Sequence, residues 1–222
     1  AWGFWAEKAD GKRYIIVNGK EWGPYEGASS PYFSSDGSAW GFRAKKADGK
    51  VYVIVNGKEW GPYGPYKVTY PPHFSSDGSA WGFEAEKADG KEYVIVNGKE
   101  WGPYEGAFSL YFSSDGSVWG FEAWKADGKV YVIVNGEEWG PYGPYESAFW
   151  LNFSLDGSAW GFEAEKADGK WYVIVNGKEW GPYEDASWPH FSSDGSALFY
   201  AATMTKPSYY RIDRVKVQVS AE

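Results

Sequence analysis

Residues 33–63 read FSSDGSAWGFRAKKADGKVYVIVNGKEWGPY, and close copies of this stretch run along the whole 222-residue chain. The tripeptide Trp-Gly-Phe, preceded by Ala or Val, places tryptophans at Trp2, Trp40, Trp81, Trp119 and Trp160, and Leu198 holds the sixth place. Shorter and longer steps alternate between these places. A fixed period of about 40 residues predicts an array of one repeated supersecondary unit.

Alternate repeats are longer because Gly-Pro-Tyr is doubled, at Gly61–Tyr66 and at Gly140–Tyr145. The larger unit is therefore a pair of repeats, such as the stretch from Trp2 to the equivalent Trp81. Residues 80–107 and 159–186 are identical at 26 of 28 positions, and surface positions match as well as core positions. Such identity is typical of an array that was designed or recently amplified from one pair.

Each repeat contains four strand signals separated by turn signals. In the second repeat the expected strands are Pro31–Ser34, Ala39–Lys45, Val51–Val55 and Glu59–Tyr63. Asp-Gly and Asn-Gly pairs lie between them and favour tight antiparallel hairpins, because these residues tolerate positive φ. The third strand is apolar on both faces, as expected between packed sheets. Pro62 cannot donate to a sheet, so the fourth strand is expected at the outer edge.

Four antiparallel strands per repeat are typical of a propeller blade, and we expect one all-β β-propeller domain over residues 1–222. Repeats begin near 2, 40, 81, 119, 160 and 198. Six blades are favoured, five blades with a displaced C-terminal hairpin are the alternative, and an open or intermolecular arrangement is a third option.

The two ends of the chain decide how such a ring closes. The first repeat lacks an inner strand, and the last pair of strands is expected at Ala197–Met204 and Tyr209–Asp213. Val215–Val219 is expected to form a separate strand, either the outer strand of the last blade or the missing strand of the first. We therefore expect a closed, monomeric ring.

The pentapeptide Phe-Ser-Ser-Asp-Gly begins at Phe33, Phe74, Phe112 and Phe191, and Phe153 begins the variant Phe-Ser-Leu-Asp-Gly. It resembles the Phe-Ser-Pro-Asp-Gly hallmark of WD40-like propeller repeats of the TolB type, and the resemblance covers nearly the whole chain. It implies four-stranded blades. Ser or Leu replaces the hallmark Pro, and the Gly-His and Trp-Asp signature of true WD40 repeats is absent. A weaker similarity to tryptophan-glycine repeats depends on Trp-Gly-Phe alone.

Composition excludes several classes of protein. The net charge is −8, from 22 Lys and Arg against 30 Asp and Glu, and no basic run is present, so nucleic acid is not an expected partner. No apolar run approaches the ~20 residues of a membrane span, and no signal-peptide pattern opens the given chain, so we expect a soluble protein of unassigned compartment. The absence of cysteine excludes disulfides, thiolate metal sites and cysteine nucleophiles.

Tryptophans in the repeated Glu-Trp-Gly-Pro-Tyr motif are the first ligand-binding candidates. Either their rings stack on sugars, since aromatic faces beside polar groups suit such ligands, or they cover the edge of each blade. Two further candidates lie in the variable segment before the inner strand, where site diversification and drift explain the variation equally well. The candidates are Trp22, Trp60, Trp101, Trp139, Trp180, Trp150 and Trp188. The Trp-Gly-Phe tryptophans are instead expected in the core, on the face that carries Phe.

A second candidate set precedes the inner-strand Phe, and alternation along a strand turns it away from that Phe. Its members are Tyr32, His73, Tyr111, Asn152 and His190. On innermost strands they would line a central channel. Two histidines could hold a metal or an anion, but they lack a carboxylate at fixed spacing, so a hydrogen-bonding lining without metal or cofactor is favoured.

The sequence shows no nucleophile with a base, no phosphate loop and no repeated carboxylate pair, so an enzyme is not expected. The expected function is a multivalent binding module, most plausibly a lectin-like, carbohydrate-binding one, because repetition gives avidity to weak sites. The alternatives are a repeat scaffold without a ligand and a protein-interaction platform. Glycans or a protein are thus the expected partners.

Overall fold

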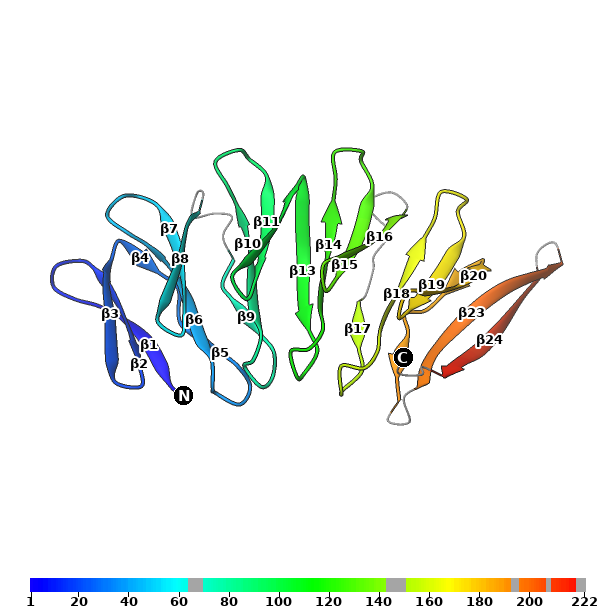
Figure 1. Ribbon diagram of the computed structural model, residues 1–222, viewed down its shortest axis with the longest axis horizontal. Coiled ribbons are helices and arrows are strands. Elements are labelled where there is room, and N and C mark those ends of the chain that lie inside the picture. Colours follow the sequence, from blue (N-terminus) through cyan, green and yellow to red (C-terminus); the bar gives the residue numbers. More distant parts are fainter. Residues whose placement is uncertain (64–69, 143–150, 193–195, 207–208, 219–222) are drawn as a thin grey trace. The chain divides into compact units, whose positions relative to one another are not determined.

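A computed structural model of the chain describes residues 1–63, 70–142, 151–192, 196–206 and 209–218 (Figure 1). The chain divides into two compact units, Ala1–Gly116 and Ser117–Glu222, which are treated separately below. In the described ranges the regular structure consists of β-strands joined by short hairpins.

The first unit contains three sheets. Its strands are β1 (Gly3–Glu7), β2 (Arg13–Val17), β3 (Lys20–Tyr25), β4 (Gly27–Ala28), β5 (Tyr32–Phe33), β6 (Trp40–Lys45), β7 (Val51–Val55), β8 (Lys58–Tyr63), β9 (His73–Phe74), β10 (Trp81–Glu86), β11 (Glu92–Val96), β12 (Lys99–Tyr104) and β13 (Gly106–Phe112). The sheet orders are β1-β2-β3, β4-β6-β7-β8 with β5 also paired to β6, and β9-β10-β11-β12. Strand β13 packs against β10 and β11.

The second unit repeats this arrangement. Its strands are β14 (Trp119–Trp124), β15 (Val130–Val134), β16 (Glu137–Tyr142), β17 (Asn152–Phe153), β18 (Trp160–Glu165), β19 (Trp171–Val175), β20 (Lys178–Tyr183), β21 (Asp185–Ala186), β22 (His190–Phe191), β23 (Ser196–Lys206) and β24 (Tyr209–Gln218). Strands β14, β15 and β16 pair in sequence order, as do β17 to β20. Strand β23 pairs with β21, β22 and β24.

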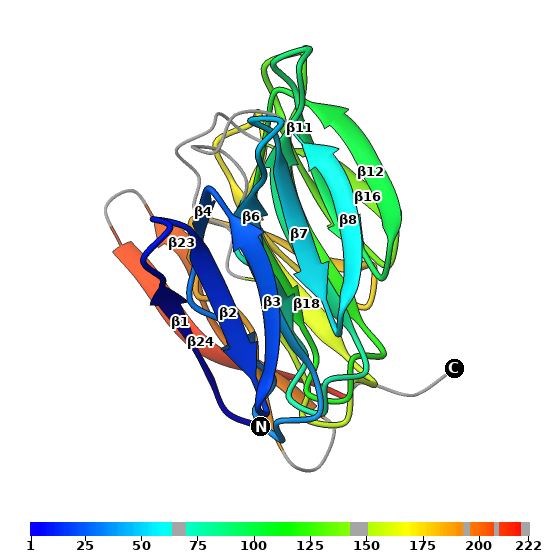
Figure 2. The ribbon, with the colours of Figure 1, turned by 90° about the vertical axis from the view of Figure 1, so that its left-hand side faces the viewer.

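The predicted order of strands within a repeat is confirmed. The strand that carries Gly-Pro lies at the outer edge of its sheet, as β8, β12 and β20 show, and Figure 2 shows β6, β7 and β8 side by side. Opposite Val51 and Val53 the outer strand presents Tyr63 and Trp60, so a β-bulge lies at the Gly-Pro step. The first repeat has three strands, as expected. The fold is of the β-propeller class; the number of blades and the closure of a ring stay predictions.

Asn-Gly turns join the third and fourth strands as predicted. Asn56 and Gly57 have φ values of 49° and 81°, the left-handed region that a tight hairpin turn requires. The turn also holds the start of the second strand. The Trp40 N–H donates to Asn56 Oδ1 at 2.9 Å, and the Asn56 N–H donates to the Trp40 carbonyl at 2.9 Å. Asn56 therefore forms the turn between the third and fourth strands with its backbone and holds the start of the second strand with its side chain.

Neighbouring repeats pack through aromatic pairs. The ring centroid of Trp22, on the first outer strand, lies 5.3 Å from that of Trp40 in the next repeat. The rings of Tyr25 and Phe42 meet edge-on, with their centroids 5.7 Å apart. Figure 1 shows β3 and β6, the strands that carry them. The same pairs recur with Trp60–Trp81 at 5.0 Å and Tyr63–Phe83 at 5.2 Å, and with Trp139–Trp160 and Tyr142–Phe162 in the second unit. The motif Trp-Gly-Pro-Tyr thus packs on the Trp-Gly-Phe that follows it.

The opposite face of each second strand approaches the next inner strand closely. A Cβ atom on Gly41 would lie 2.7 Å from the Pro72 side chain and 2.7 Å from the Ile54 carbonyl oxygen, so a side chain here would clash. Phe4 of the first repeat is 51% exposed, whereas Phe42, on which Tyr25 packs edge-on, is 0% exposed. Burial of this Phe is therefore a property of the junction between repeats.

Two expectations about strands were wrong. Val215–Val219 is not a separate strand, because Val215 and Val217 continue β24 and pair with Phe199 and Ala197 of β23. No turn residue interrupts β24, so the hairpin extends over its whole length; Val219 lies outside the described residues. The segment after the outer strand is not only a loop, since β4 pairs with β6 and so satisfies backbone groups.

Buried carboxylates occupy the fourth place of Trp-Gly-Phe-Glu in the second unit. Glu163 is 4% exposed, and its Oε2 has no hydrogen-bond partner among the described residues. Burial raises the pKa of Glu163 to about 8, with a smaller contribution from the charge of Glu122. Burial also raises the pKa of Glu122 to about 7. Both groups are therefore more easily protonated in the folded chain.

We expect coupling between the tryptophans of one junction. Trp60→Ala and Trp81→Ala should each lower the free energy of unfolding by about 2 to 4 kcal/mol, because each removes a large, partly buried ring. The double variant should lose about 0.5 to 1.5 kcal/mol less than the sum, since the two rings contact each other. Denaturant melts measure this, with Trp22→Ala plus Trp81→Ala, from different junctions, as the additive control. Additivity in both pairs would contradict the packing.

We expect the second unit to lose stability as pH rises from about 5 to 8. The raised pKa of Glu163 means that the folded chain binds more protons than the unfolded chain in this range, so the free energy of unfolding falls with pH. Glu163→Gln should stabilise the protein by about 2 to 4 kcal/mol at pH 9 and little at pH 5. Glu165→Gln, at the end of the same strand, is the control. Equal effects of the two variants in melts across pH would refute this.

Candidate functional site

The outer-strand tryptophans lie between two covering groups. A Cβ atom on Gly57 would lie 2.6 Å from the ring of Trp22, so that ring covers the Asn-Gly turn of the next repeat. On its own strand, Lys20 Nζ lies 4.2 Å from the Trp22 ring centroid, within the range of a cation–π contact. Trp60 has the same contact with Lys58 at 4.1 Å. Lysine side chains and the turn of the next repeat therefore cover these rings.

The indole nitrogens of this set point into the junctions as well. The Nε1 atoms of Trp22, Trp60, Trp139 and Trp180 are buried and have no acceptor among the described residues. A buried donor cannot reach a ligand hydroxyl, so this geometry favours the edge-covering interpretation over sugar stacking. Trp101 holds the same strand position on β12, with Lys99 Nζ 4.0 Å from its ring.

The remaining two tryptophan candidates differ. Trp150 lies outside the described residues. Trp188 is exposed and meets the ring of His190 at 5.8 Å in an edge-on arrangement. The structure thus brings together two residues that the sequence placed in separate candidate sets.

The inner-strand set is directed away from the packed face, as alternation predicts. Tyr32 is 46% exposed and Tyr111 is 40% exposed, whereas the adjacent Phe33 is only partly exposed. His73 and His190 are also exposed, and Asn152 is partly exposed. In the first unit β9 packs against β13, and in the second unit β17 packs against β22. His73 and Tyr111 therefore lie on neighbouring strands in the first unit, as do Asn152 and His190 in the second unit. A common channel stays a prediction.

A carboxylate lies behind His73 that sequence analysis did not assign. Glu84 Oε2 is 3.9 Å from His73 Nε2, and Glu84 Oε1 accepts a hydrogen bond from the Leu110 N–H at 3.2 Å. Burial raises the pKa of Glu84, and the histidine and the Leu110 N–H oppose this effect. In the sequence, the sign of this carboxylate was Glu84 itself, a charged residue that follows the apolar Trp-Gly-Phe of its strand. This carboxylate lies close to the imidazole of an inner-strand candidate.

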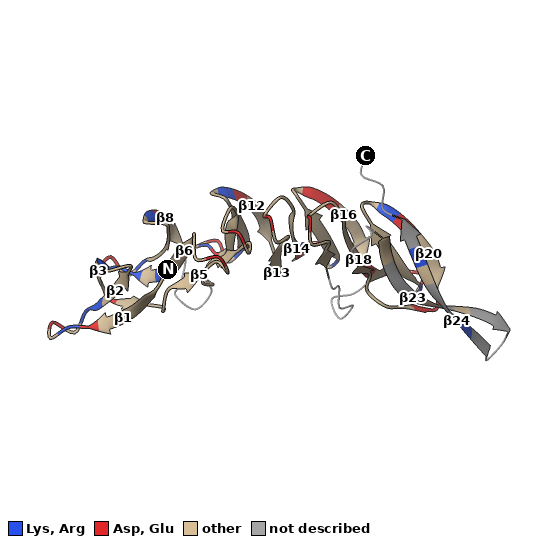
Figure 3. Ribbon diagram, turned by 90° about the horizontal axis from the view of Figure 1, so that it is seen from below, with Lys and Arg blue, Asp and Glu red and all other residues tan. Residues whose placement is uncertain are grey.

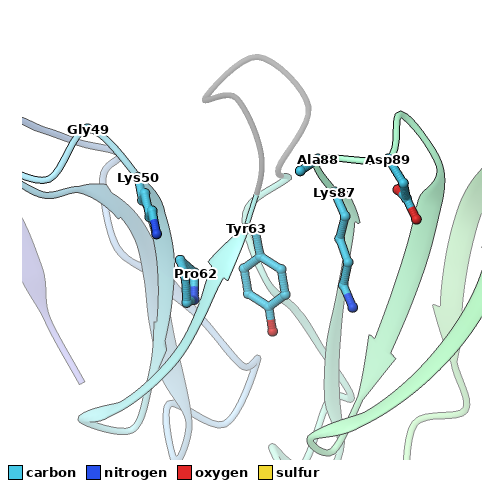
Figure 4. Close-up of a pocket in the computed structure, with 7 residues that line it drawn as sticks. All are labelled: Gly49, Lys50, Pro62, Tyr63, Lys87, Ala88 and Asp89. Carbon is cyan, nitrogen blue, oxygen red and sulfur yellow. The ribbon is translucent and has the colours of Figure 1, made fainter.

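A hollow in the first unit lies at the outer edge, between the second and third repeats. It has a volume of about 590 Å³ and is lined by Gly49, Lys50, Pro62, Tyr63, Lys87, Ala88 and Asp89 (Figure 4). A hollow of about 310 Å³ between the first and second repeats is lined by Glu7, Gly11, Arg13, Glu26, Gly27 and Lys45. None of these residues was a sequence-based candidate.

Charged side chains elsewhere are mostly paired within each repeat. Lys87 Nζ lies 2.6 Å from Glu100 Oε1, and Lys8 Nζ lies 2.7 Å from Glu21 Oε1. Figure 3 shows acidic and basic residues interspersed along the strands and turns. Within the described ranges no group of three His, Asp or Glu side chains is arranged to hold a metal ion.

No helix in the described part of the chain is long and apolar enough to cross a membrane. No protein-family model matches the sequence, and no curated protein matches it. Comparison with solved structures gave several matches, which share little sequence with the chain.

The chain is similar to the β-propeller domain of the Trilobed protease from Pyrococcus furiosus, with 16% identity, a TM-score of 0.46, and coverage of 86% of this chain and 68% of that one. For TolB from Acinetobacter baumannii the identity is 13%, the TM-score 0.37, and the coverage 98% and 63%. For a eukaryotic initiation factor the identity is 12%, the TM-score 0.50, and the coverage 97% and 65%. The chain spans 63% to 68% of these three proteins. The likeness concerns the fold: the chain resembles β-propellers of the TolB type.

Proposed function

We propose that the protein is a non-catalytic binding module that recognises carbohydrates through its inner-strand residues. The residues are Tyr32, His73, Tyr111, Asn152, Trp188 and His190. A fold of the propeller class supports a binding or interaction role, and the sugar specificity is the part that is proposed.

One observation carries the proposal. The aromatic residues that every repeat copies are used in packing between repeats, including Trp60 against Trp81 and Tyr63 against Phe83. The position before the inner-strand Phe is different, because it varies between repeats and its side chains are largely exposed. Variation confined to an exposed position of a copied scaffold is the pattern expected of a recognition surface.

The chemistry of this set suits sugars. Tyr32 and Tyr111 combine an exposed ring face with a hydroxyl group, and Trp188 lies edge-on against His190. Aromatic faces contact the C–H faces of pyranose rings, and the polar groups serve the hydroxyls at their rims. Behind His73, the buried Glu84 carboxylate lies 3.9 Å from the imidazole Nε2. Several weak sites on neighbouring strands would give a multivalent surface.

We expect a glycan array to reveal binding, and calorimetry on the selected sugar to give its affinity. Tyr111→Ala should weaken that affinity at least tenfold, because an exposed ring and its hydroxyl are both lost, and Tyr111→Phe should lose less. Trp124→Ala, which removes another exposed ring at the end of β14, is the control and should change the affinity less than twofold. An array and calorimetry without any binding would refute the proposal.

A further inference from the structure

Lys50 differs from the lysines that occupy its position in odd repeats. Lys12, Lys91 and Lys170 each pair at 2.6 Å with the Glu that follows Trp-Gly-Pro-Tyr, namely Glu26, Glu105 and Glu184. After Tyr63 the chain has Gly64 in place of Glu, and residues 64–69 contain no Asp or Glu. Lys50 makes no such ion pair among the described residues, although its charge acts on the Asp48 carboxylate, two residues before it. It is therefore an ammonium group without its usual counter-charge.

A hollow lies beside this lysine. The cavity of about 590 Å³ is lined by Lys50 from one side and by Lys87 and Asp89 from the other, and Figure 4 shows Pro62 and Tyr63 between them. The ring of Tyr63 is held edge-on against Phe83 at 5.2 Å, so this apolar wall is firmly placed. Glu100 neutralises Lys87, whereas Lys50 makes no ion pair among the described residues and interacts electrostatically with Asp48.

We propose that this cavity, between Lys50, Pro62, Tyr63 and Asp89, binds an anionic monosaccharide, a sugar bearing a carboxylate or a phosphate. Its acidic group contacts Lys50, its ring lies against Pro62 and Tyr63, and its hydroxyls donate to Asp89. The volume accommodates a ring of this size with its first hydration shell. The site is separate from the inner-strand surface and does not depend on the function proposed there.

Charge supports the placement of the two ends of the sugar. Asp89 accepts hydrogen bonds from the Lys91 N–H at 3.0 Å and from the Tyr93 hydroxyl at 2.8 Å, so its orientation is fixed. These bonds lower its pKa, so it stays an acceptor near neutral pH. Lys50 offers three donors and a full charge, and a carboxylate or phosphate is the group that best satisfies both. A neutral sugar offers the ammonium no ion pair.

The test uses the full chain and three probes: glucuronate, glucose 6-phosphate and glucose. Saturation-transfer NMR and calorimetry should show that at least one anionic probe binds at least tenfold more tightly than glucose. The stronger anionic probe tells whether a carboxylate or a phosphate is preferred. Because Lys129 holds the same repeat position in the second unit, the variant is Lys50→Ala with Lys129→Ala. It should lower the affinity at least tenfold.

The matched control is Lys91→Ala with Lys170→Ala, which removes the same number of charges at the paired position and should change the affinity less than twofold. Trp124→Ala, an exposed ring outside both proposed sites, should also leave anion binding unchanged. Circular dichroism verifies that each variant is folded. Equal binding of glucose and the anions, equal losses in the two lysine double variants, or no binding of any probe would overturn the proposal.

Discussion

The packing of one repeat's Trp and Tyr on the next repeat's Trp and Phe is the interaction on which the rest of the structure depends. A single three- or four-stranded sheet buries little apolar surface, and Phe4 of the first repeat remains half exposed. Once Tyr25 covers Phe42 and Trp22 covers Trp40, the sheet gains a dry face. Stability therefore comes from junctions between sheets more than from any sheet alone, as in other repeat proteins.

This packing involves the most conspicuous residues of the sequence. Tryptophans in a repeated, carboxylate-flanked motif have the composition of a sugar site, yet Trp22 and Trp60 lie between lysines and the following repeat. What remains available for recognition is less regular. It includes Tyr111 before the inner-strand Phe and Lys50 without its Glu. Both positions stand out because they depart from the copied pattern.

Much of the fold could be predicted from local chemistry. Asn56-Gly57 requires a turn with positive φ, and Pro62 requires a position where no N–H is needed, so hairpins and edge strands follow directly. The candidate sites were harder to predict from the sequence, because Glu84 and His73 lie on different strands and meet only where β9 pairs with β10. The Lys50 cavity could be found only by comparing the junctions between repeats in the structure. Strand β4 could not be predicted, because its pairing with β6 uses backbone groups that leave no signal in the sequence.

The junctions come in two kinds that alternate along the chain, one closed by an ion pair such as Lys12–Glu26 and one carrying the doubled Gly-Pro-Tyr. Loss or duplication of a single repeat would place two junctions of the same kind side by side. Loss or duplication of a whole pair, by contrast, reproduces the alternation already present. A change in repeat number by whole pairs would therefore lengthen or shorten the protein while leaving each surviving interface unchanged.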